Sequence, residues 1–244
     1  MIKIENFEVL GWEHAIRGMR NPMNSWEKSD SVFIDEDGDW YTITGDPGPF
    51  KNVDEFSTDG QQVYIGSNDL DLMKRLRNAG TDHRKFMRMI TVYLDITAPL
   101  YWWKEFDTYK VGTVANSCST MHKIAAKEFT LDDFSHEQLF HNVNDTEMWL
   151  DIDFLNVLDN TIFYLNKARE LYLKTHDKKY WWQMIQLLPS SYNQKRTVML
   201  NYEVLANIYK SRRHHKLDCW HTFCDWIESL PYSELITGKE HEVE

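Results

Sequence analysis

The sequence predicts an α+β protein in which strands alternate with long helices. Between Phe86 and Ile96, two sets of side chains alternate with the period of two that is typical of a β-strand. From Asp145 to Thr175, apolar residues instead recur at intervals of three and four, as on one face of an amphipathic helix. With 244 residues, 42% of them apolar, the chain can bury a substantial core. We therefore expect one compact domain over residues 1–237 and a frayed tail at 238–244.

The N-terminal part of the chain is expected to combine strands with two helices. The expected elements are an edge strand at 2–10, a helix at 12–20, a hairpin insertion at 31–44 and a helix at 68–79. The hairpin is predicted from two β-rich runs that flank the turn Asp35-Glu36-Asp37-Gly38. This acidic turn is too short for a calcium loop, because no glutamate stands at the closing position. Asn68 or Asp69 is expected to cap the second helix, and Gly80 to close it.

Helices are expected to dominate the rest of the chain. Pro99 follows the strand and stands where a helix favours proline. Between Ala98 and Lys123 we therefore expect a helix, a polar bend and the start of a second helix. A polar loop is expected at 128–144. Further helices are expected at 145–175, at 178–188 before Pro189, and at 196–230 before Pro231.

Two arginines in the first helix leave two interpretations open. Arg17 and Arg20 are three residues apart and therefore share one face of the helix. They belong either to a solvated face or to a clamp that binds an anion with two guanidinium groups.

The spacing of the histidines argues against a metal site. His136 and His141 are five residues apart, whereas the zinc-protease motif needs four, so they diverge around a regular helix. On the expected last helix, His214, Asp218 and His221 share a face, but three ligands on one helix seldom close around one metal. We expect no metal.

Composition limits the classes of partner. The formal net charge of −11 argues against nucleic acid and anionic membranes as partners, and favours small molecules or proteins. No apolar run approaches the roughly 20 residues that span a bilayer. Three cysteines form no paired framework, so we expect a cytoplasmic protein. Ten Trp, twelve Tyr and twelve Phe are expected mainly in cores and interfaces.

The order of four short segments resembles that of the flavin-dependent thymidylate synthases. These segments are I-R-G-M-R (16–20), the junction Ala98-Pro99, the pair Leu188-Pro189 and N-Y-E-V-L-A-N-I-Y-K-S-R (201–212). The resemblance runs over most of the chain. It implies a central, mostly antiparallel sheet flanked by long helices.

The segment 201–212 is the most specific part of this resemblance. Asn201, Asn207 and Arg212 stand at the spacing of the family's N-x-R-x-L-x-N-x-x-x-x-R motif, and Lys195 stands where the family has an upstream arginine. Glu203 replaces the motif's first arginine, which reverses the charge at a position expected to face a nucleotide phosphate. The resemblance makes Asn201 and Asn207 cofactor-binding residues. It makes substrate-binding residues of Lys195, Glu203, Arg212, Arg17 and Arg20.

The family's second signature, R-H-R-x-x-S-x-N-E-x-S-x-R, is degraded in this chain. Without a gap its arginines and serines fall on Thr108, Lys110, Thr113, Cys118 and Thr120, and a shift of one residue instead matches Asn116 and Ser119. Neither register restores the arginines. The resemblance implies cofactor-binding roles for Lys110, Thr113, Asn116 and Ser119. The cations that could replace the lost arginines are Lys104, Lys110, Lys123, Arg84, Arg88, Lys195 and Arg212.

The resemblance implies an enzyme that methylates dUMP to dTMP with methylene-tetrahydrofolate, FAD and NADPH. FAD would lie between subunits of a homotetramer, and no protein nucleophile would be needed because the flavin supplies the hydride. Two alternatives stay open. The chain could be a related flavin or nucleotide enzyme with an altered substrate, or a catalytically silent relative that acts as a binding or interaction protein.

Overall fold

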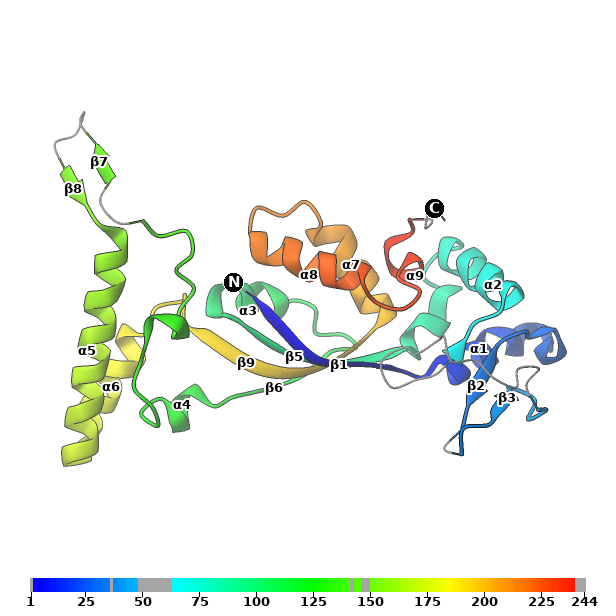
Figure 1. The fold of residues 1–244 in the computed structure, drawn as a ribbon, viewed down its shortest axis with the longest axis horizontal. Coiled ribbons are helices and arrows are strands. Elements are labelled where there is room, and N and C mark those ends of the chain that lie inside the picture. Colours follow the sequence, from blue (N-terminus) through cyan, green and yellow to red (C-terminus); the bar gives the residue numbers. More distant parts are fainter. Residues whose placement is uncertain (1, 36, 48–62, 141–142, 146–149, 240–244) are drawn as a thin grey trace. The chain divides into compact units, whose positions relative to one another are not determined.

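The computed structural model describes residues 2–35, 37–47, 63–140, 143–145 and 150–239 of the chain (Figure 1). The chain divides into two compact units. Unit 1 comprises residues 1–3, 96–108 and 116–196, and unit 2 comprises residues 4–95, 109–115 and 197–244. The expectation of a single domain stays a prediction.

The described residues form an α+β fold with an antiparallel sheet and long helices, as the sequence predicts. The strands are β1 (Lys3–Leu10), β2 (Val32–Ile34), β3 (Trp40–Thr42), β4 (Val63–Tyr64), β5 (Thr91–Pro99), β6 (Val114–Ser117), β7 (Val143–Asp145), β8 (Leu150–Ile152) and β9 (Asn193–Asn201). The α-helices are α1 (Trp12–Arg20), α2 (Ser67–Asn78), α3 (Leu100–Phe106), α4 (Thr120–Lys123), α5 (Phe154–Thr175), α6 (Lys178–Leu187), α7 (Tyr202–Arg212), α8 (Asp218–Glu228) and α9 (Glu234–Thr237). The 3₁₀ turns in the described ranges are η1 (Asn21–Met23), η2 (Trp26–Lys28), η3 (Arg84–Arg88) and η4 (Leu131–Asp133).

The largest sheet has the strand order β1-β5-β9-β6. β1 is therefore an edge strand, which confirms the prediction for residues 2–10. The expected hairpin is also present, because β2 pairs with β3 in antiparallel register, with Phe33 opposite Tyr41. A third strand, β4, pairs with the other side of β2. The hairpin turn is held by Asp35, whose backbone nitrogen donates to the carbonyl oxygen of Asp39.

The strand predicted from Phe86 is wrong in its first part. Residues Arg84–Arg88 form the 3₁₀ turn η3, and strand β5 begins at Thr91. Phe86 and Met87 are neighbours in sequence and both are buried. A strand with one buried face cannot bury two successive side chains, so local packing overrides the alternation.

The long helix predicted at 196–230 is also wrong, because three elements occupy this range. Strand β9 ends at Asn201, whose side-chain oxygen accepts a hydrogen bond from the backbone nitrogen of Val204 and so caps α7. A turn then separates α7 from α8, and there His215 Nδ1 accepts a hydrogen bond from the backbone nitrogen of Leu217. His214 lies in the turn after α7 and His221 lies on α8, so the two histidines share no helix face.

Two further boundaries differ from the prediction. Helix α5 begins at Phe154 and not at residue 145, because Asp153 caps it by accepting from the backbone nitrogen of Asn156. The segment before it forms the paired strands β7 and β8, and Trp149 lies outside the described residues. Between Ala98 and Lys123, the polar bend leads into strand β6 before the short helix α4 begins at Thr120.

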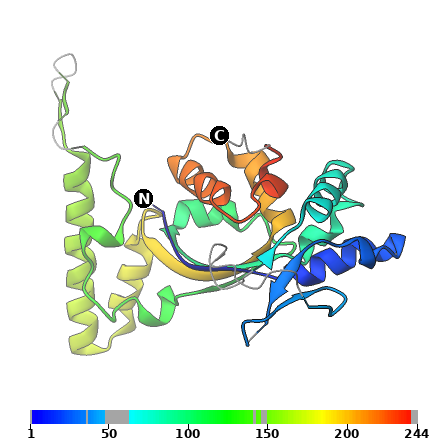
Figure 2. The same ribbon diagram turned by 45° about the vertical axis from the view of Figure 1, so that its right-hand side comes forward.

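Unit 1 contains a helical hairpin with its own apolar core. α6 packs along one side of α5, as Figures 1 and 2 show. The buried side chains of this core are Ile124, Phe129, Phe134, Leu158, Leu165, Ala168 and Met184. Because α5 and α6 hold the segment 124–134 through this core, they fix the residues that follow α4.

Unit 2 is organised around a buried ion pair between α1 and α2. Arg20 Nε donates to Asp69 Oδ1 at 2.6 Å, and both side chains are almost fully buried. The second carboxylate oxygen of Asp69 accepts from the hydroxyls of Ser29 and Ser31 and from the backbone nitrogens of Asp30 and Ser31. Asp69 therefore fixes the start of the β2 strand against α2, and it does not act as the simple cap that the sequence suggests.

Candidate functional site

A pocket of about 420 Å³ in unit 1 is lined by residues of the degraded signature. We call it the Lys195 pocket. Its polar lining includes Cys118, Ser119, Thr120, Lys123, Lys127, Asp132, Asp133, Asn193, Gln194 and Lys195. The pocket thus combines residues that the resemblance assigns to the cofactor, such as Ser119, with Lys195, which it assigns to the substrate.

The local structure around α4 and β9 explains how this pocket forms. The backbone nitrogen of Cys118 donates to the carbonyl oxygen of Lys195, which joins the end of β6 to β9. Gln194 Nε2 donates to the carbonyl oxygen of Cys118 and to Thr120 Oγ1, each at 3.1 Å. Ser119 Oγ accepts from the backbone nitrogen of His122 and starts α4. These bonds fix the backbone of the pocket wall.

The charges of the Lys195 pocket favour an anion. Lys127 forms an ion pair with Asp133, so these two charges largely cancel. The lining as a whole holds three lysines, Lys123, Lys127 and Lys195, and two carboxylates, Asp132 and Asp133. A phosphate group is an anion that lysine binds as a point charge, whereas an arginine would hold it with a planar fork.

Asn193, which lines the pocket, has a buried side-chain oxygen without a donor in the described ranges. Its Oδ1 atom is buried and accepts no hydrogen bond from the described residues, while its Nδ2 donates to the carbonyl oxygen of Asp132. A buried acceptor without a donor costs roughly 1–3 kcal/mol, so a ligand N–H or O–H that reached it would be favoured. A flavin and a uracil nucleotide both carry such donors beside their phosphates. The donor and acceptor set therefore fits either group.

Unit 2 contains a second polar cluster, which surrounds Glu203 at the start of α7. Arg84 Nε donates to Glu203 Oε1 at 3.1 Å, and Arg88 donates to both carboxylate oxygens. Arg84 Nη2 also donates to Asn207 Oδ1 at 3.2 Å. We call these four residues the Glu203 cluster. Two arginines and one glutamate leave a net charge of +1, so the charge reversal at Glu203 is compensated by side chains of η3.

Burial alone would raise the pKa of Glu203, but hydrogen bonds from Arg88 and Arg84 and their charges outweigh it, so its net pKa is lowered. Because the folded-state pKa lies below the ordinary value of 4.5, ionised Glu203 stabilises the fold above that pH. This stabilisation is lost as the pH falls through the folded-state pKa.

We therefore expect Glu203→Gln to lower the free energy of unfolding at pH 7, and the difference from the wild type to shrink below about pH 4.5. Urea unfolding at a series of pH values measures this. Glu27→Gln, at an exposed position, serves as the control. A difference for Glu203→Gln that stayed constant between pH 7 and pH 3 would contradict the ion cluster.

The turn at 109–113 packs against the start and the end of α7. Gly112 has φ of 79°, and a Cβ atom there would lie 3.0 Å from Asn201 Nδ2, so glycine allows this close approach. Tyr109 Oη accepts from Arg212 Nε at 3.0 Å, and the Arg212 guanidinium stacks over the ring of Trp220. Thr113 Oγ1 is buried, and it neither donates a hydrogen bond to the described residues nor accepts one from them.

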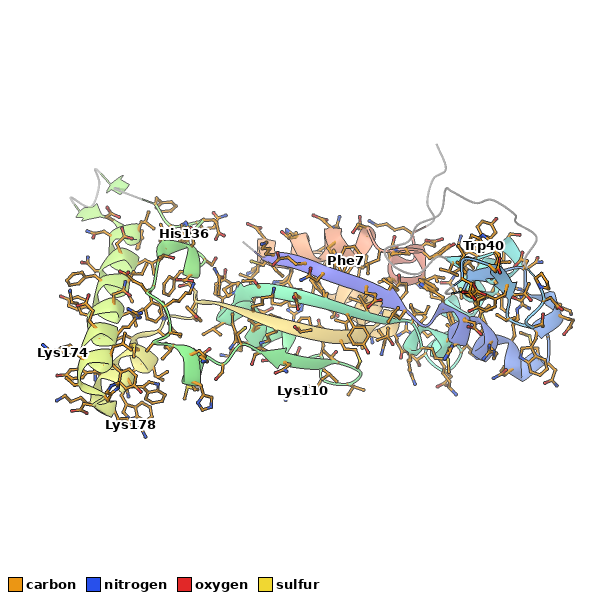
Figure 3. All side chains as sticks on the ribbon, turned by 60° about the horizontal axis from the view of Figure 1, so that its bottom comes forward. Phe7, Trp40, Lys110, His136, Lys174 and Lys178 are labelled. Carbon is orange, nitrogen blue, oxygen red and sulfur yellow. The ribbon has the colours of Figure 1, made fainter. Side chains whose placement is uncertain are left out.

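The remaining site residues predicted from the sequence do not line the Lys195 pocket. Arg17 pairs with Glu13 of its own helix. Arg20 is buried and directs its guanidinium to Asp69 and to the carbonyl oxygens of Ser25 and Lys28. An anion clamp formed by both arginines is therefore wrong, since one of them points into the core of unit 2. Lys110 lies exposed on the turn before β6, as Figure 3 shows, and Asn116 is exposed on that strand.

Sequence patterns did not identify five polar residues of the pocket, namely Lys127, Asp132, Asp133, Asn193 and Gln194. Asn193 and Gln194 directly precede Lys195 and lie on β9. The sequence pattern predicts a helix from residue 196, so it does not indicate that Asn193 and Lys195 are alternate residues of one strand. The available sequence signal was the polar run Asn193 to Arg196, which follows the helix-ending Pro189.

The sequence matches no protein-family model and no curated protein. Solved structures are similar over nearly the whole chain. Thymidylate synthase X from Helicobacter pylori, crystallised with FAD and dUMP, has a TM-score of 0.61 at 14% identity and covers 98% of each chain. The UMP/dUMP methylase PolB from Streptomyces cacaoi, bound with 5-Br UMP, has a TM-score of 0.55 at 12% identity, with 98% of this chain and 95% of that chain covered. The chain therefore has the fold of these proteins. None of the helices that the structure describes is long and apolar enough to cross a membrane.

Proposed function

We propose that this protein is a divergent relative of the flavin-dependent thymidylate synthases, which binds FAD and methylates the uracil ring of dUMP. The observation that carries this proposal is the Lys195 pocket, which brings the remains of the family signature together with Lys195 on the β9 strand. The similarity of fold over 98% of the chain to a synthase crystallised with FAD and dUMP supports it.

The residues of the Lys195 pocket would bind a phosphate group, either of the nucleotide or of the flavin. Lys123 and Lys195 supply positive charge, and Ser119 and Thr120 supply hydroxyl groups at the pocket wall. Asn193 Oδ1 would accept from a ring N–H or a sugar hydroxyl. When bound, a reduced flavin supplies the hydride for methyl-group formation, with NADPH as reductant and methylene-tetrahydrofolate as carbon donor.

In unit 2, hydrogen bonds orient the side chains that we propose to contact or position the ligand. Asn201 is held as the cap of α7, and Asn207 Oδ1 accepts from Arg84, which leaves the Asn207 amide hydrogens for a ligand. Glu203 holds Arg84 and Arg88 in place, so it would position these two cations and would not itself contact a phosphate. Thr113 and Lys110 stay proposed cofactor contacts from the signature.

A second candidate function is methylation of UMP. One of the similar structures is a UMP/dUMP methylase that was crystallised with 5-Br UMP. The phosphate and the uracil edge are the same in UMP and dUMP, and the two differ only in the sugar 2′-hydroxyl. The pocket residues proposed above recognise the shared groups, so substrate choice between them must be measured.

An assay with both nucleotides tests the proposed function. Purified protein is incubated with FAD, NADPH, methylene-tetrahydrofolate and either dUMP or UMP, and the methylated nucleotide is separated by chromatography. We expect dTMP from dUMP, with omission of FAD abolishing it. A methylated product from UMP but not from dUMP would favour the second candidate function. Folded protein that binds both FAD and dUMP but yields no product would overturn the enzymatic proposal and support a silent binding protein.

A further inference from the structure

The side-chain amide of Gln194, on β9 in unit 1, is held from both sides. Arg196 Nε donates to Gln194 Oε1 at 3.0 Å, and Gln194 Nε2 donates to the carbonyl oxygen of Cys118 and to Thr120 Oγ1, each at 3.1 Å. A guanidinium group can only donate and a backbone carbonyl can only accept, so turning the amide over would break both contacts. The partners of Gln194 therefore fix the orientation of its amide.

Arg196 is itself held in place within unit 1. Its Nη1 donates to Asp107 Oδ1 at 2.7 Å, and its guanidinium carbon lies 4.2 Å from the centre of the Trp103 ring. Trp103 Nε1 in turn donates to the backbone oxygen of Gln194 at 2.9 Å. Only 15% of the Arg196 side chain is exposed, and Arg196 is not among the described residues that line the Lys195 pocket. Its charge is paired with Asp107, so Arg196 acts on the pocket through Gln194.

These contacts determine what Thr120 can offer a ligand. Thr120 Oγ1 accepts from Gln194, whose two amide hydrogens are both used, so the Thr120 hydroxyl hydrogen is left to donate elsewhere. Among the residues that the structure describes, no acceptor takes this hydrogen, and Thr120 lines the Lys195 pocket. In the ungapped register Thr120 also stands where the family signature has its last arginine, so a neutral donor takes the place of a charged one.

The direction of this hydrogen bond indicates which ligand group it serves. Ionised phosphate oxygens accept hydrogen bonds and donate none, so they match a hydroxyl that already accepts from the protein. Lys123 and Lys195 line the same pocket and favour the same anion.

We propose that Thr120 donates its hydroxyl hydrogen to the phosphate group bound in the Lys195 pocket, and that Arg196 is a positioning residue for this contact. Arg196 keeps the Gln194 amide turned so that Thr120 accepts from it and donates to the ligand. This proposal rests on the proposed function, because it names a contact and a positioning residue of the same site.

Titration of the full chain with dUMP and, separately, with FAD tests the contact. Lys195→Ala identifies the ligand whose phosphate lies in the pocket, because the affinity for that ligand should fall. Thr120→Val has nearly the same shape as the wild type but no hydroxyl, and should bind this ligand about tenfold more weakly. Thr120→Ser should stay within about threefold of the wild type, since the hydrogen bond remains. Equal affinities of Thr120→Val and the wild type would overturn the contact.

A double-mutant cycle tests the positioning role. Arg196→Ala should weaken binding of the same ligand about threefold to fivefold, both in the wild type and in the Lys123→Ala background. In the Thr120→Val background it should have no further effect, because the hydroxyl that Arg196 positions is gone. Gln194→Met removes the amide without changing the net charge and should depend on Thr120 in the same way, which keeps the test decisive if circular dichroism shows that Arg196→Ala is unfolded. Effects of equal size in all three backgrounds would show a general structural or electrostatic role and overturn the positioning role.

Failure of the proposed function would give a different result. If Lys195→Ala changed the affinity for neither dUMP nor FAD, both the proposed role of the Lys195 pocket and this inference would be wrong. If Lys195→Ala weakened binding but Thr120→Val and Arg196→Ala did not, this inference alone would be wrong.

Discussion

Replacing Asp69 with alanine is expected to lower the free energy of unfolding by about 3–5 kcal/mol. The change leaves the guanidinium of Arg20 in the interior of unit 2 without its counter-charge. It also removes the acceptor for the hydroxyls of Ser29 and Ser31 and for two backbone nitrogens of the same segment. Urea unfolding at pH 7 followed by tryptophan fluorescence measures the effect.

Two further variants separate the buried charge from other consequences of the change. Asp71→Ala alters an exposed carboxylate on the same helix, and we expect a change below about 0.5 kcal/mol. Arg20→Met/Asp69→Leu removes both charges together, and should recover part of the stability lost in Asp69→Ala. If Asp69→Ala and Asp71→Ala were equally stable, the ion pair would not organise this unit.

The second large effect is expected for ligand affinity. Lys123→Ala and Lys195→Ala should each weaken binding of the phosphate-bearing ligand about tenfold. A hydrogen bond to a charged group contributes roughly 1.5–3 kcal/mol, and we expect the lower end because Lys123 is exposed and Lys195 is half-buried. The double variant should lose about a hundredfold if the two contributions are independent. Separate titrations with FAD and with dUMP will identify which phosphate the pocket binds.

Lys127→Ala is the matched control for the two lysines. It removes a lysine from the same pocket, but one whose charge is already cancelled by Asp133. We expect its affinities for FAD and dUMP to stay within about threefold of the wild type. Equal losses for all three single lysine variants would indicate a general electrostatic effect, and no loss in any of them would exclude the Lys195 pocket as a phosphate site.

The sequence predicts an element well where its pattern is confined to that one short element. The α6 helix, the β1 edge strand and the β2–β3 hairpin agree with the prediction because their patterns are local. The prediction is wrong around Asn201, where a strand that buries Val198 and Leu200 runs directly into a helix. Apolar residues at this junction fit both the strand period of two and the helix period of 3.6. Only the cap formed by Asn201 marks the boundary.

The candidate site could be predicted only in part, for a similar reason. The spacing of the family motifs identifies Lys195 and Ser119 as site residues, and both line the same pocket. Glu203 could be identified as a charge reversal, but its partners Arg84 and Arg88 precede it by more than a hundred residues. No local sequence pattern links Glu203 to these two arginines. Only the fold shows that the arginines compensate the reversed charge. The burial of Arg20 depends in the same way on Asp69, which lies on another helix.

The absorption spectrum of the purified full chain tests the central claim most directly. We expect a flavin band near about 450 nm, either as purified or after addition of FAD and removal of the excess, and a change in that band when dUMP is added. Lys127→Ala should show the same band, while Lys123→Ala/Lys195→Ala should show a weaker one or a reduced response to dUMP. A folded, colourless wild-type protein that retained no added FAD would contradict the account.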